Sequence, residues 1–316
     1  MVFRYLLRFL LFSAAALLAI LASNSSMPQY ATNLNEIIEQ ETGRKQNPAY
    51  PYRCTAGAHR GASVDHRENT LAALKAADQS RKYAFIEFDV QYSKDNRIVV
   101  YHDKRLLRLF GSMRSIGSST FTELEELTAG EIALYEEVMD VLTKKINIEI
   151  KSQGDPEEDE RLADEIIADI KSRKRGKDVL ISSISSAVIR YINDKYPAVP
   201  TGQVYWLTSS TYLHFEGLTE GLYEEFSATG ADYLMLHVAN LRNIEDLLKL
   251  KPRGKAIVFW DFDDRMYVVH KNITDRLWGD SAIKAFFQYL RYKLFSLFQL
   301  RQQDSGEPPL NEPVIA

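Results

Sequence analysis

The chain has 316 residues, of which 45% are hydrophobic and 26% are charged, and its net charge is −4 at pH 7. This is the composition of an ordinary globular protein, and it lacks the positive excess that nucleic-acid binding requires. The single cysteine, Cys54, excludes an intramolecular disulfide and a cysteine-rich zinc site. Because its neighbours predict a strand, we expect a buried, inert thiol.

The N-terminus carries a hydrophobic segment. Arg4 and Arg8 precede an apolar run from Phe9 to Ala22, which is typical of a signal peptide and is short for a membrane span. Residues 1–23 therefore fit a cleaved signal peptide or an uncleaved signal anchor equally well. Either predicts an exported domain, periplasmic or otherwise extracytoplasmic, or one associated with the membrane through this segment.

The remaining ends of the chain are predicted to lie outside the main fold. Residues 24–51 resemble a linker with one short helix, and residues 302–316, with three prolines, are predicted to be disordered. Between them, residues 52–301 form the expected domain. Its last segment, from residue 281, is predicted to be an aromatic-rich helix whose spacing favours packing on the domain over lying on anionic lipid.

Short apolar runs alternate with amphipathic patterns from Tyr52 onward, which indicates parallel strands joined by crossover helices in an α/β fold. Seven such strands favour a TIM (β/α)8 barrel over an open sheet. The expected strands are 55–59, 85–91, 146–151, 179–182, 203–207, 233–236 and 256–260, and the expected helices are 70–80, 157–174, 185–195, 218–229 and 244–250.

Two segments break this alternation. Residues 98–101 predict a strand only a few residues after the strand at 85–91, so the two must form an antiparallel hairpin. An insertion of about residues 104–134, with a helix near 121–127, follows that hairpin. The candidate eighth strand, 266–269, follows its predecessor with no room for a helix, which predicts irregular barrel closure or another hairpin.

Polar residues alternate with apolar ones in the strand at 85–91. Ile86, Phe88 and Val90 share one face, whereas Glu87 and Asp89 share the other. The helix-facing side of a barrel strand is apolar, so we expect both acids to point inward near the carboxyl end, where barrel active sites lie. Two unpaired buried carboxylates are unfavourable, and a bound cation would remove that penalty.

The same alternation recurs at residues 146–151, where Asn147, Glu149 and Lys151 share the inward face. Glu149 is a candidate third oxygen ligand, and three acidic oxygens suit Ca²⁺ or Mg²⁺ rather than Zn²⁺. Lys151 could neutralise a phosphate oxygen. The structural alternative is internal ion pairing, for example of Lys151 with Glu149.

Two histidines end predicted strands. His59 is followed by Arg60 and Gly61, whose glycine permits an unusual turn, and His102 is followed by Asp103. A pair of histidines across a phosphate can act as general base and general acid. The remaining histidines show no such partners in the sequence and are interpreted as structural or exposed: His66, His214, His237 and His270.

Five ordered motifs together resemble the glycerophosphodiester phosphodiesterase family. They are His59-Arg60-Gly61-Ala62, Glu68-Asn69-Thr70, Glu87-Phe88-Asp89-Val90, Val99-Val100-Tyr101-His102-Asp103 and Ile148-Glu149-Ile150-Lys151. The resemblance implies a TIM barrel with a small insertion. It also implies metal-dependent hydrolysis of a small phosphodiester to an alcohol and glycerol phosphate, started by the substrate's own neighbouring hydroxyl.

The resemblance also assigns roles to residues. It implies a divalent metal, Ca²⁺ or Mg²⁺, held by Glu87, Asp89 and Glu149. It implies acid–base catalysis by His59 and His102. The phosphate would be bound by Arg60 and Lys151, with support from Glu68, Asn69 and Asp103.

The sequence departs from the family pattern mainly in its last third. The family's Trp-Thr-Val-Asn motif is present only as Trp260-Asp261-Phe262-Asp263, and Trp260 is a candidate pocket wall. These changes affect the expected alcohol side of the pocket. One alternative function is therefore lysophospholipase D-like or sphingomyelinase D-like cleavage of membrane lipids. A non-catalytic binding barrel is less favoured, since no site residue is missing.

Overall fold

The computed structural model describes residues 8–15, 54–212, 216–262 and 264–269. The chain divides into two compact units, 1–272 and 273–316, and every described residue belongs to the first. Residues 8–15 are helical, and none of the helices in the described ranges is long and apolar enough to cross a membrane. The rest of the N-terminal segment, the predicted linker, and the predicted C-terminal helix and tail lie outside the described residues.

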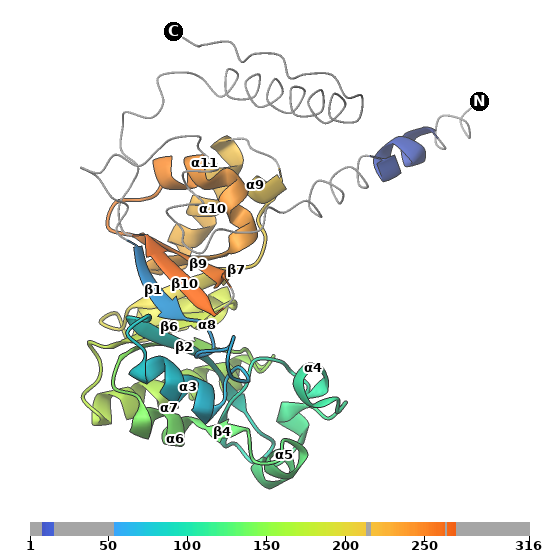
Figure 1. Cartoon of the computed structure of the whole chain (residues 1–316). Helices are drawn as coiled ribbons and strands as arrows, with labels where there is room; N and C mark the ends of the chain where they lie inside the picture. The colour runs from blue at the N-terminus through green and yellow to red at the C-terminus, as the bar shows by residue number, and fades with distance from the viewer. Residues whose placement is uncertain (1–7, 16–53, 213–215, 263, 270–316) are drawn as a thin grey trace, which may run out of the picture. The chain divides into compact units, whose positions relative to one another are not determined.

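Eight strands close into a barrel, which confirms the predicted TIM architecture. The sheet closes because β1 pairs with β2 on one side and with β10 on the other (Figure 1). The barrel strands are β1 (Cys54–Ala58), β2 (Phe85–Tyr92), β5 (Lys145–Ile150), β6 (Val179–Ser183), β7 (Thr201–Tyr205), β8 (Tyr233–His237), β9 (Ala256–Phe262) and β10 (Arg265–Val269).

For the eighth strand, the sequence left open whether the barrel closes irregularly or whether this segment forms another hairpin. β10 runs antiparallel to both β9 and β1, so it is a hairpin partner and also the strand that closes the barrel. The other neighbouring pairs in the barrel are parallel. The physical reason is the short connection after β9, because a parallel crossover needs a dozen or more residues.

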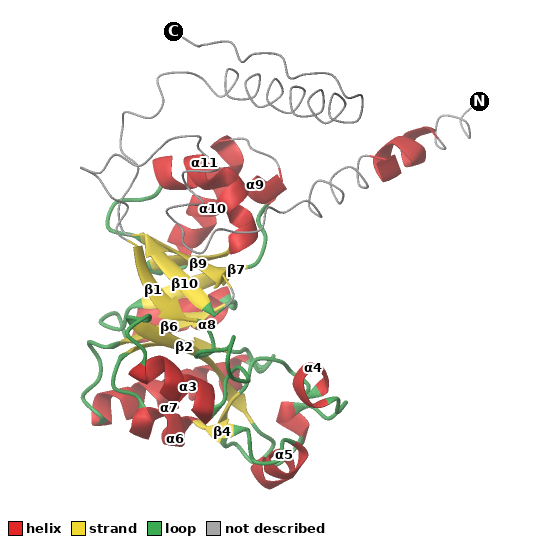
Figure 2. Cartoon of the chain, viewed as in Figure 1, coloured by secondary structure: helices red, strands yellow, loops and turns green. Residues whose placement is uncertain are grey.

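Helices cover the outside of the strands (Figure 2). On the β2 and β5 side, outward residues such as Phe88 and Ile148 join a buried cluster with Leu162 and Ile166 of the helix α7 (Pro156–Ser172). This is the outer face that the alternating pattern predicted. The helices of the barrel are α3 (Leu71–Gln79), α6 (Tyr135–Val141), α7 (Pro156–Ser172), α8 (Ser186–Lys195), α9 (Ser209–Tyr212), α10 (Glu216–Ala228) and α11 (Ile244–Lys249), with the 3-10 helix η2 (Val238–Asn243) before α11.

The barrel interior is chemically divided. On the β7 to β10 side the inward side chains form an apolar cluster that includes Val204, Met235 and Trp260. On the β2 and β5 side the buried side chains include Glu87 and Asp89. Glu87 and Asp89 thus occupy the β2 and β5 side of the interior, and the apolar cluster occupies the β7 to β10 side.

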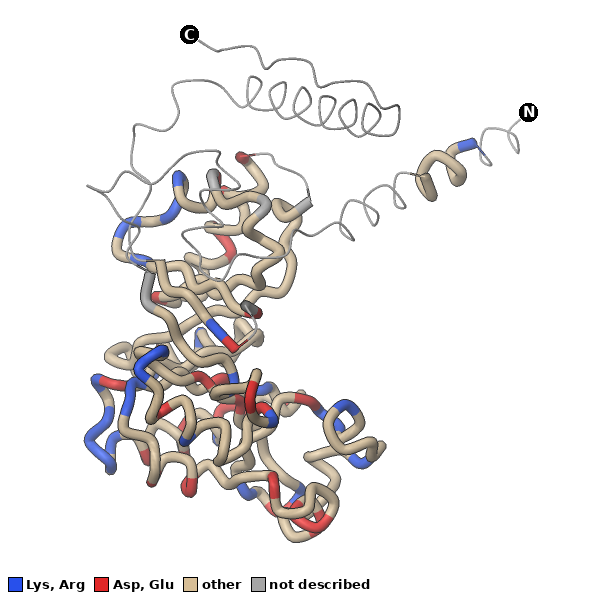
Figure 3. The backbone as a smooth tube through the Cα atoms, in the orientation of Figure 1, with Lys and Arg blue, Asp and Glu red and all other residues tan. Residues whose placement is uncertain are grey.

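The predicted hairpin and insertion form an excursion from β2. β3 (Ile98–Val100) pairs antiparallel with β2, and β4 (Ala133–Leu134) pairs with β3. Between them lie α4 (Leu107–Phe110), η1 (Ile116–Ser118) and α5 (Phe121–Leu127), around a small core of their own. Basic residues gather around α4 and acidic ones along α5 (Figure 3).

Candidate active site

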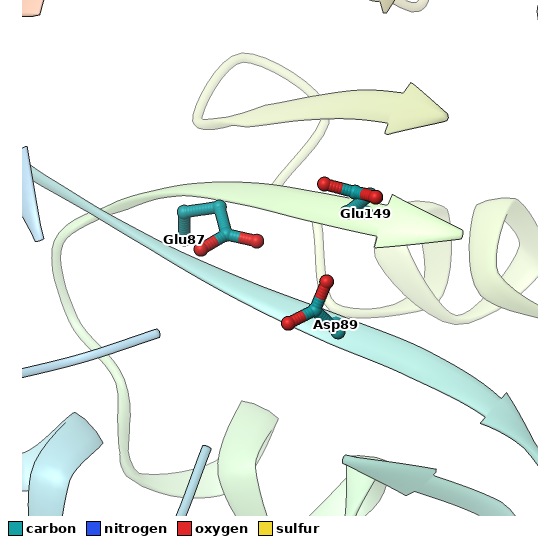
Figure 4. A group of neighbouring side chains, drawn as sticks. All are labelled: Glu87, Asp89 and Glu149. Carbon is teal, nitrogen blue, oxygen red and sulfur yellow. The ribbon is translucent and has the colours of Figure 1, made fainter. Parts of the chain in front are cut away.

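Three carboxylates converge inside the barrel. Glu87 and Asp89 project from β2 and Glu149 from β5, where Asp89 and Glu149 are direct partners in the parallel pairing. One oxygen of each lies within 4.8 Å of the others, and the three side chains turn toward one another (Figure 4). The convergence predicted from the two alternating strands is therefore confirmed.

The electrostatics of this trio favour a cation. Burial and the charges of Asp89 and Glu149 raise the pKa of Glu87 well above its usual range. Glu87 Oε1 is buried and has no hydrogen-bond partner within the described ranges. A hard divalent ion accepts an all-oxygen donor set of this kind, so the residues present fit such an ion.

Asp89 behaves differently from Glu87. Burial by itself would raise the pKa of Asp89, but Lys151, His102 and Arg60 together hold it well below its usual range. The Lys151 ammonium lies 2.7 Å from Asp89 Oδ1 and also contacts Glu149 Oε1. The ion pairing considered as a structural alternative is thus present and reaches Asp89 as well. The Arg60 Nε also lies 3.6 Å from Asp89 Oδ2, but this guanidinium is shared with Glu68. Lys151 and Arg60 together therefore do not neutralise three carboxylates, and the trio keeps a need for positive charge.

The turn after β1 delivers His59 and a backbone donor to the trio. Arg60 has a left-handed φ of 58°, and its N–H donates to Glu87 Oε2 at 2.8 Å. Gly61 follows with φ of 81°, which confirms the predicted turn. A Cβ at Gly61 would lie only 2.7 Å from the backbone carbonyl carbon of Ala73 in α3.

Gly61→Ala is therefore expected to destabilise the protein by about 2–3 kcal/mol, because the added methyl meets backbone that cannot move aside and the φ is unfavourable for alanine. The free energy of unfolding from urea titration measures this. Gly111→Ala provides the control, since Gly111 also has a positive φ but nothing within 4 Å of its would-be Cβ. Equal losses in the two variants would contradict the close-contact argument.

The Glu68-Asn69-Thr70 segment supports the site in three ways. Glu68 accepts a hydrogen bond from Arg60 Nη1 at 2.8 Å. The Asn69 side chain donates to Asp89 Oδ2 at 2.7 Å and accepts from the Asp89 N–H at 3.2 Å. Thr70 caps α3. The segment thus holds the arginine, orients a carboxylate and starts a helix.

His102 reaches the site from the excursion. Its Nδ1 lies 2.6 Å from Asp103 Oδ1, the carboxylate of the next residue in the chain. Gln91 secures this segment by donating to the backbone oxygens of Tyr101 and Asp103. Arg108 of α4 donates to Asp103 at 2.7 Å and to both oxygens of Glu68, which links the insertion to the rim of the barrel.

His59 is 8% exposed, and its ring centroid lies 5.7 Å from that of Trp260, the predicted pocket wall. Burial, with the charge of Arg60, lowers the pKa of His59 to about 3. His59 is therefore neutral at physiological pH and able to accept a proton. A charged His102 also lowers the pKa of His59, which places the two imidazoles within electrostatic reach.

Comparison with known proteins agrees with this geometry. Residues 59–283 match the model of the glycerophosphoryl diester phosphodiesterase family. The chain belongs to this family. A glycerophosphodiester phosphodiesterase of Bacillus subtilis strain 168 is 26% identical over 270 residues, which cover 72% of this chain and 90% of that relative. A human lysophospholipase D is 24% identical over 250 residues, covering 66% and 76% of the two chains.

Solved structures give the same result. The crystal structure of a glycerophosphodiester phosphodiesterase from Thermotoga maritima is 30% identical and superposes with a TM-score of 0.50, covering 65% of this chain and 84% of that one. A family structure from Parabacteroides distasonis, at 22% identity and a TM-score of 0.52, shares the fold.

One part of this phosphodiesterase site was missed by the sequence interpretation. His237, interpreted as lacking a partner, lies with Nε2 2.9 Å from Asp261 Oδ2, and its ring stacks on Trp206. The expected lack of a partner was wrong, because His237 and Asp261 are 24 residues apart and meet only where β8 and β9 end side by side. The expected structural role agrees with the buried ring, whose Nδ1 accepts the Ala239 N–H at the start of η2. Arg108 and Gln91 were missed as well, although Gln91 shares the alternating inward face of Glu87 and Asp89.

The low pKa of His59 has a consequence for stability in the phosphodiesterase. Unfolded His59 takes up a proton below about pH 6.5, whereas folded His59 stays neutral down to about 3. The unfolded state thus binds more protons in this window, so the free energy of unfolding should fall by about 1.4 kcal/mol per pH unit from this group as pH drops. Urea unfolding of the wild type and His59→Gln at several pH values checks this, and parallel curves would contradict it.

Proposed function

We infer that the protein is a metal-dependent phosphoric diester hydrolase that cleaves glycerophosphodiesters into an alcohol and glycerol phosphate. The observation that carries this function is the buried trio of Glu87, Asp89 and Glu149, with His59 and His102 beside it, in the barrel of a phosphodiesterase family. Within the described ranges, this trio is the arrangement that suits a hard divalent ion.

We propose that the trio holds Ca²⁺ or Mg²⁺, because its donors are all carboxylate oxygens. When bound, such an ion lowers the pKa of the attacking hydroxyl and stabilises negative charge on phosphoryl oxygens. Asn69 keeps Asp89 oriented for this task, and the Arg60 N–H does the same for Glu87.

The histidines divide the proton transfers between them. Neutral His59 takes the proton from the substrate's glycerol hydroxyl as its oxygen forms a bond to phosphorus. His102 donates a proton to the departing alcohol oxygen as that P–O bond breaks, and Asp103 supports the charged imidazole. Water then opens the cyclic phosphate with the two roles exchanged.

Arg60 and Lys151 are proposed to bind the phosphate. Lys151 lies between Asp89 and Glu149, from where its ammonium can turn to a phosphoryl oxygen once a dication neutralises the carboxylates. The Arg60 guanidinium contacts Glu68 at 2.8 Å and lies 3.6 Å from Asp89 Oδ2. Positive groups placed in advance at a phosphate are the usual source of electrostatic stabilisation in phosphoryl transfer.

The direct test is hydrolysis of glycerophosphocholine by the full-length protein. We expect release of an alcohol and glycerol phosphate, loss of activity with EDTA, and recovery when Mg²⁺ or Ca²⁺ is added in excess. Titrating each ion separately identifies the preferred metal. Absence of activity on a panel of glycerophosphodiesters, with metal binding intact, would favour the non-catalytic barrel.

A second candidate function is cleavage of lysophospholipids. Exposed apolar side chains stand on loops after the carboxyl ends of three strands, Val64 after β1, Ile184 after β6 and Trp206 after β7. An apolar rim suits a lipid surface, and one relative is named a lysophospholipase D. Rates on lysophosphatidylcholine micelles compared with soluble glycerophosphocholine would separate the two functions.

We also propose that residues 1–23 direct the protein out of the cytoplasm and either are removed or stay in the membrane. The basic and apolar pattern of this segment supports the proposal. N-terminal sequencing of the protein from membrane and soluble fractions would distinguish removal from anchoring, and full-length protein in the cytoplasm would contradict both.

A further inference from the structure

Three loops concentrate positive charge at the end of the barrel opposite the proposed active site. They lead into β2, β5 and β6 and comprise residues 80–84, 142–145 and 173–178 (the basic loops). The whole chain has more acidic than basic residues, 43 against 39, yet Asp178 is the one acidic residue of these loops. Half of their basic residues lie between α7 and β6 (Figure 3). The full set is Arg81, Lys82, Lys144, Lys145, Arg173, Lys174, Arg175 and Lys177.

Hydrogen bonds join the basic loops to one another. The Lys144 ammonium donates to the backbone oxygen of Ala77 at 2.9 Å and to that of Ser80. The Arg175 guanidinium donates to the backbone oxygen of Leu142 at 2.6 Å and to that of Lys144. Backbone carbonyls satisfy the hydrogen bonds of these two cations but do not neutralise their charge. The three loops therefore form one continuous surface that stays positive.

Acidic residues neutralise only part of this surface. Lys82 pairs with Asp264, and Arg173 pairs with Asp140 and Asp169. The other six basic residues form no ion pair with an acid in the described ranges, and two further carboxylates accompany them, Asp78 and Asp178. Four of the six are exposed to solvent: Arg81, Lys145, Lys174 and Lys177. The excess of positive charge attracts an anionic partner.

The N-terminal segment joins the barrel at the same end. β1 begins at Cys54, and the N–H of Ala84 in the first basic loop donates to the Ala56 oxygen of β1 at 2.8 Å. Residues 1–53 therefore connect to the fold beside the basic loops, and they include the apolar run proposed to direct export. Basic residues beside an apolar segment strengthen its attachment to an anionic bilayer.

We propose that the basic loops bind the anionic headgroups of a phospholipid membrane and hold the catalytic end of the barrel away from the bilayer. Charges spread over three neighbouring loops match the spread of charge on an anionic membrane. The loops precede their strands, whereas His59 follows β1 and Glu149 lies near the carboxyl end of β5. Membrane and active site are therefore placed at opposite ends of the barrel.

The orientation has a consequence for the substrate, and this part of the inference rests on the proposed function. The exposed apolar side chains of Val64, Ile184 and Trp206 lie on the catalytic end. One flat bilayer cannot contact that end and the basic loops together. A protein held by the basic loops takes its substrate from solution, which favours water-soluble diesters over lysophospholipids of the same membrane.

Sedimentation of the full-length protein with phospholipid vesicles tests the contact. The measured quantity is the association constant for equimolar phosphatidylcholine and phosphatidylglycerol divided by that for phosphatidylcholine alone. The apolar N-terminal run contributes to both constants, so the ratio reports the effect of charge. It should fall at least about 20-fold in the triple variant Arg81→Glu, Lys145→Glu and Lys177→Glu. In the wild type, added salt should lower it as well.

A second triple variant provides the matched control. Lys94→Glu, Lys104→Glu and Arg105→Glu reverse three exposed charges on the excursion that carries His102, at the other end of the barrel. This variant should keep most of the wild-type ratio, with circular dichroism confirming that both triple variants are folded. An equal loss in the two variants, or a larger loss in the control, would overturn the proposal.

Lysine labelling measures the orientation in the wild-type protein. Acetylation and mass spectrometry should show Lys145, Lys174 and Lys177 protected on vesicles with phosphatidylglycerol, while Lys94 and Lys104 react as in the free protein. Protection of Lys94 and Lys104 instead would place the catalytic end on the membrane and overturn the proposal. Binding to soluble dextran sulfate without charge-dependent binding to vesicles would overturn it as well.

Activity separates this inference from the proposed function. The Arg81, Lys145 and Lys177 triple variant should hydrolyse soluble glycerophosphocholine at the wild-type rate, because none of the three side chains belongs to the site. Vesicle binding that depends on the basic loops, in a protein inactive on every diester, would uphold the membrane surface and refute the hydrolase. Hydrolysis without charge-dependent vesicle binding would do the reverse.

Discussion

Glu87→Gln is expected to lower kcat/KM by about 10³-fold or more and to abolish tight binding of Mg²⁺ or Ca²⁺. The substitution keeps the shape of the side chain but removes one of three anionic donors, and the remaining pair already shares the Lys151 ammonium. Asp89→Asn should act in the same direction, because Lys151, His102 and Arg60 keep the buried Asp89 carboxylate ionised. Titration calorimetry of metal-stripped protein, together with steady-state kinetics, measures both effects.

The activity of Glu87→Gln should fall, but the free energy of unfolding of its metal-free form should not. Burial without a cation makes the Glu87 carboxylate unfavourable, as its raised pKa shows. Glu87→Gln should therefore leave the metal-free protein as stable as wild type or more stable, while the stabilisation by added metal disappears. Glu160→Gln, on the exposed side of α7, is the control for loss of a carboxylate. Unchanged metal affinity in Glu87→Gln would refute the assigned ligand set.

His59→Ala and His102→Ala should each reduce kcat by about 10²- to 10⁴-fold with a much smaller change in KM, because each removes a proton-transfer group and not a binding group. The double variant should lose far less than the product of the two losses, since the two histidines serve the same steps. His66→Ala is the matched control, because His66 lies in the same loop as His59 but is exposed to solvent.

The intermediate provides a second measurement for the histidines. Phosphorus NMR of slow variants should reveal whether a cyclic phosphate accumulates, as expected when the ring-opening step is impaired more than the first. Activity within tenfold of wild type in both single variants would remove the histidines from the mechanism. A loss of activity in His59→Ala but not in His102→Ala would mean that His102 positions other groups and transfers no proton itself.

Most of the site was predictable because its information is local. The alternation in residues 85–91 and 146–151 places Glu87, Asp89 and Glu149 on the inner faces of their strands whatever the rest of the chain does. The same holds for the hairpin that carries His102, since so short a connection permits only an antiparallel pair. Gly61 could be recognised as a turn residue for a similar reason, although its close contact with Ala73 could not.

Other features depend on residues that meet only after the barrel closes. Arg108 and Glu68 are 40 residues apart, and His237 and Asp261 are 24 apart. No periodic pattern within one segment predicts these contacts, because they depend on the positions that the loops at the carboxyl ends of the strands adopt in the folded barrel. Lys151 illustrates the same limit, since its inward direction and its pairing with Glu149 could be considered from the sequence, but its contact with Asp89 could not.

The sequence by itself determined the strand-and-helix alternation, the inner faces of β2 and β5, and the identity of the acids and histidines, because side-chain direction in a strand follows from a period of two residues. Only the tertiary structure decided that β10 closes the barrel by pairing with β9 and β1, and that Trp206, His237 and Asp261 gather beside Trp260. Those outcomes depend on strand register and loop geometry, which are properties of the whole closed sheet and not of any one segment.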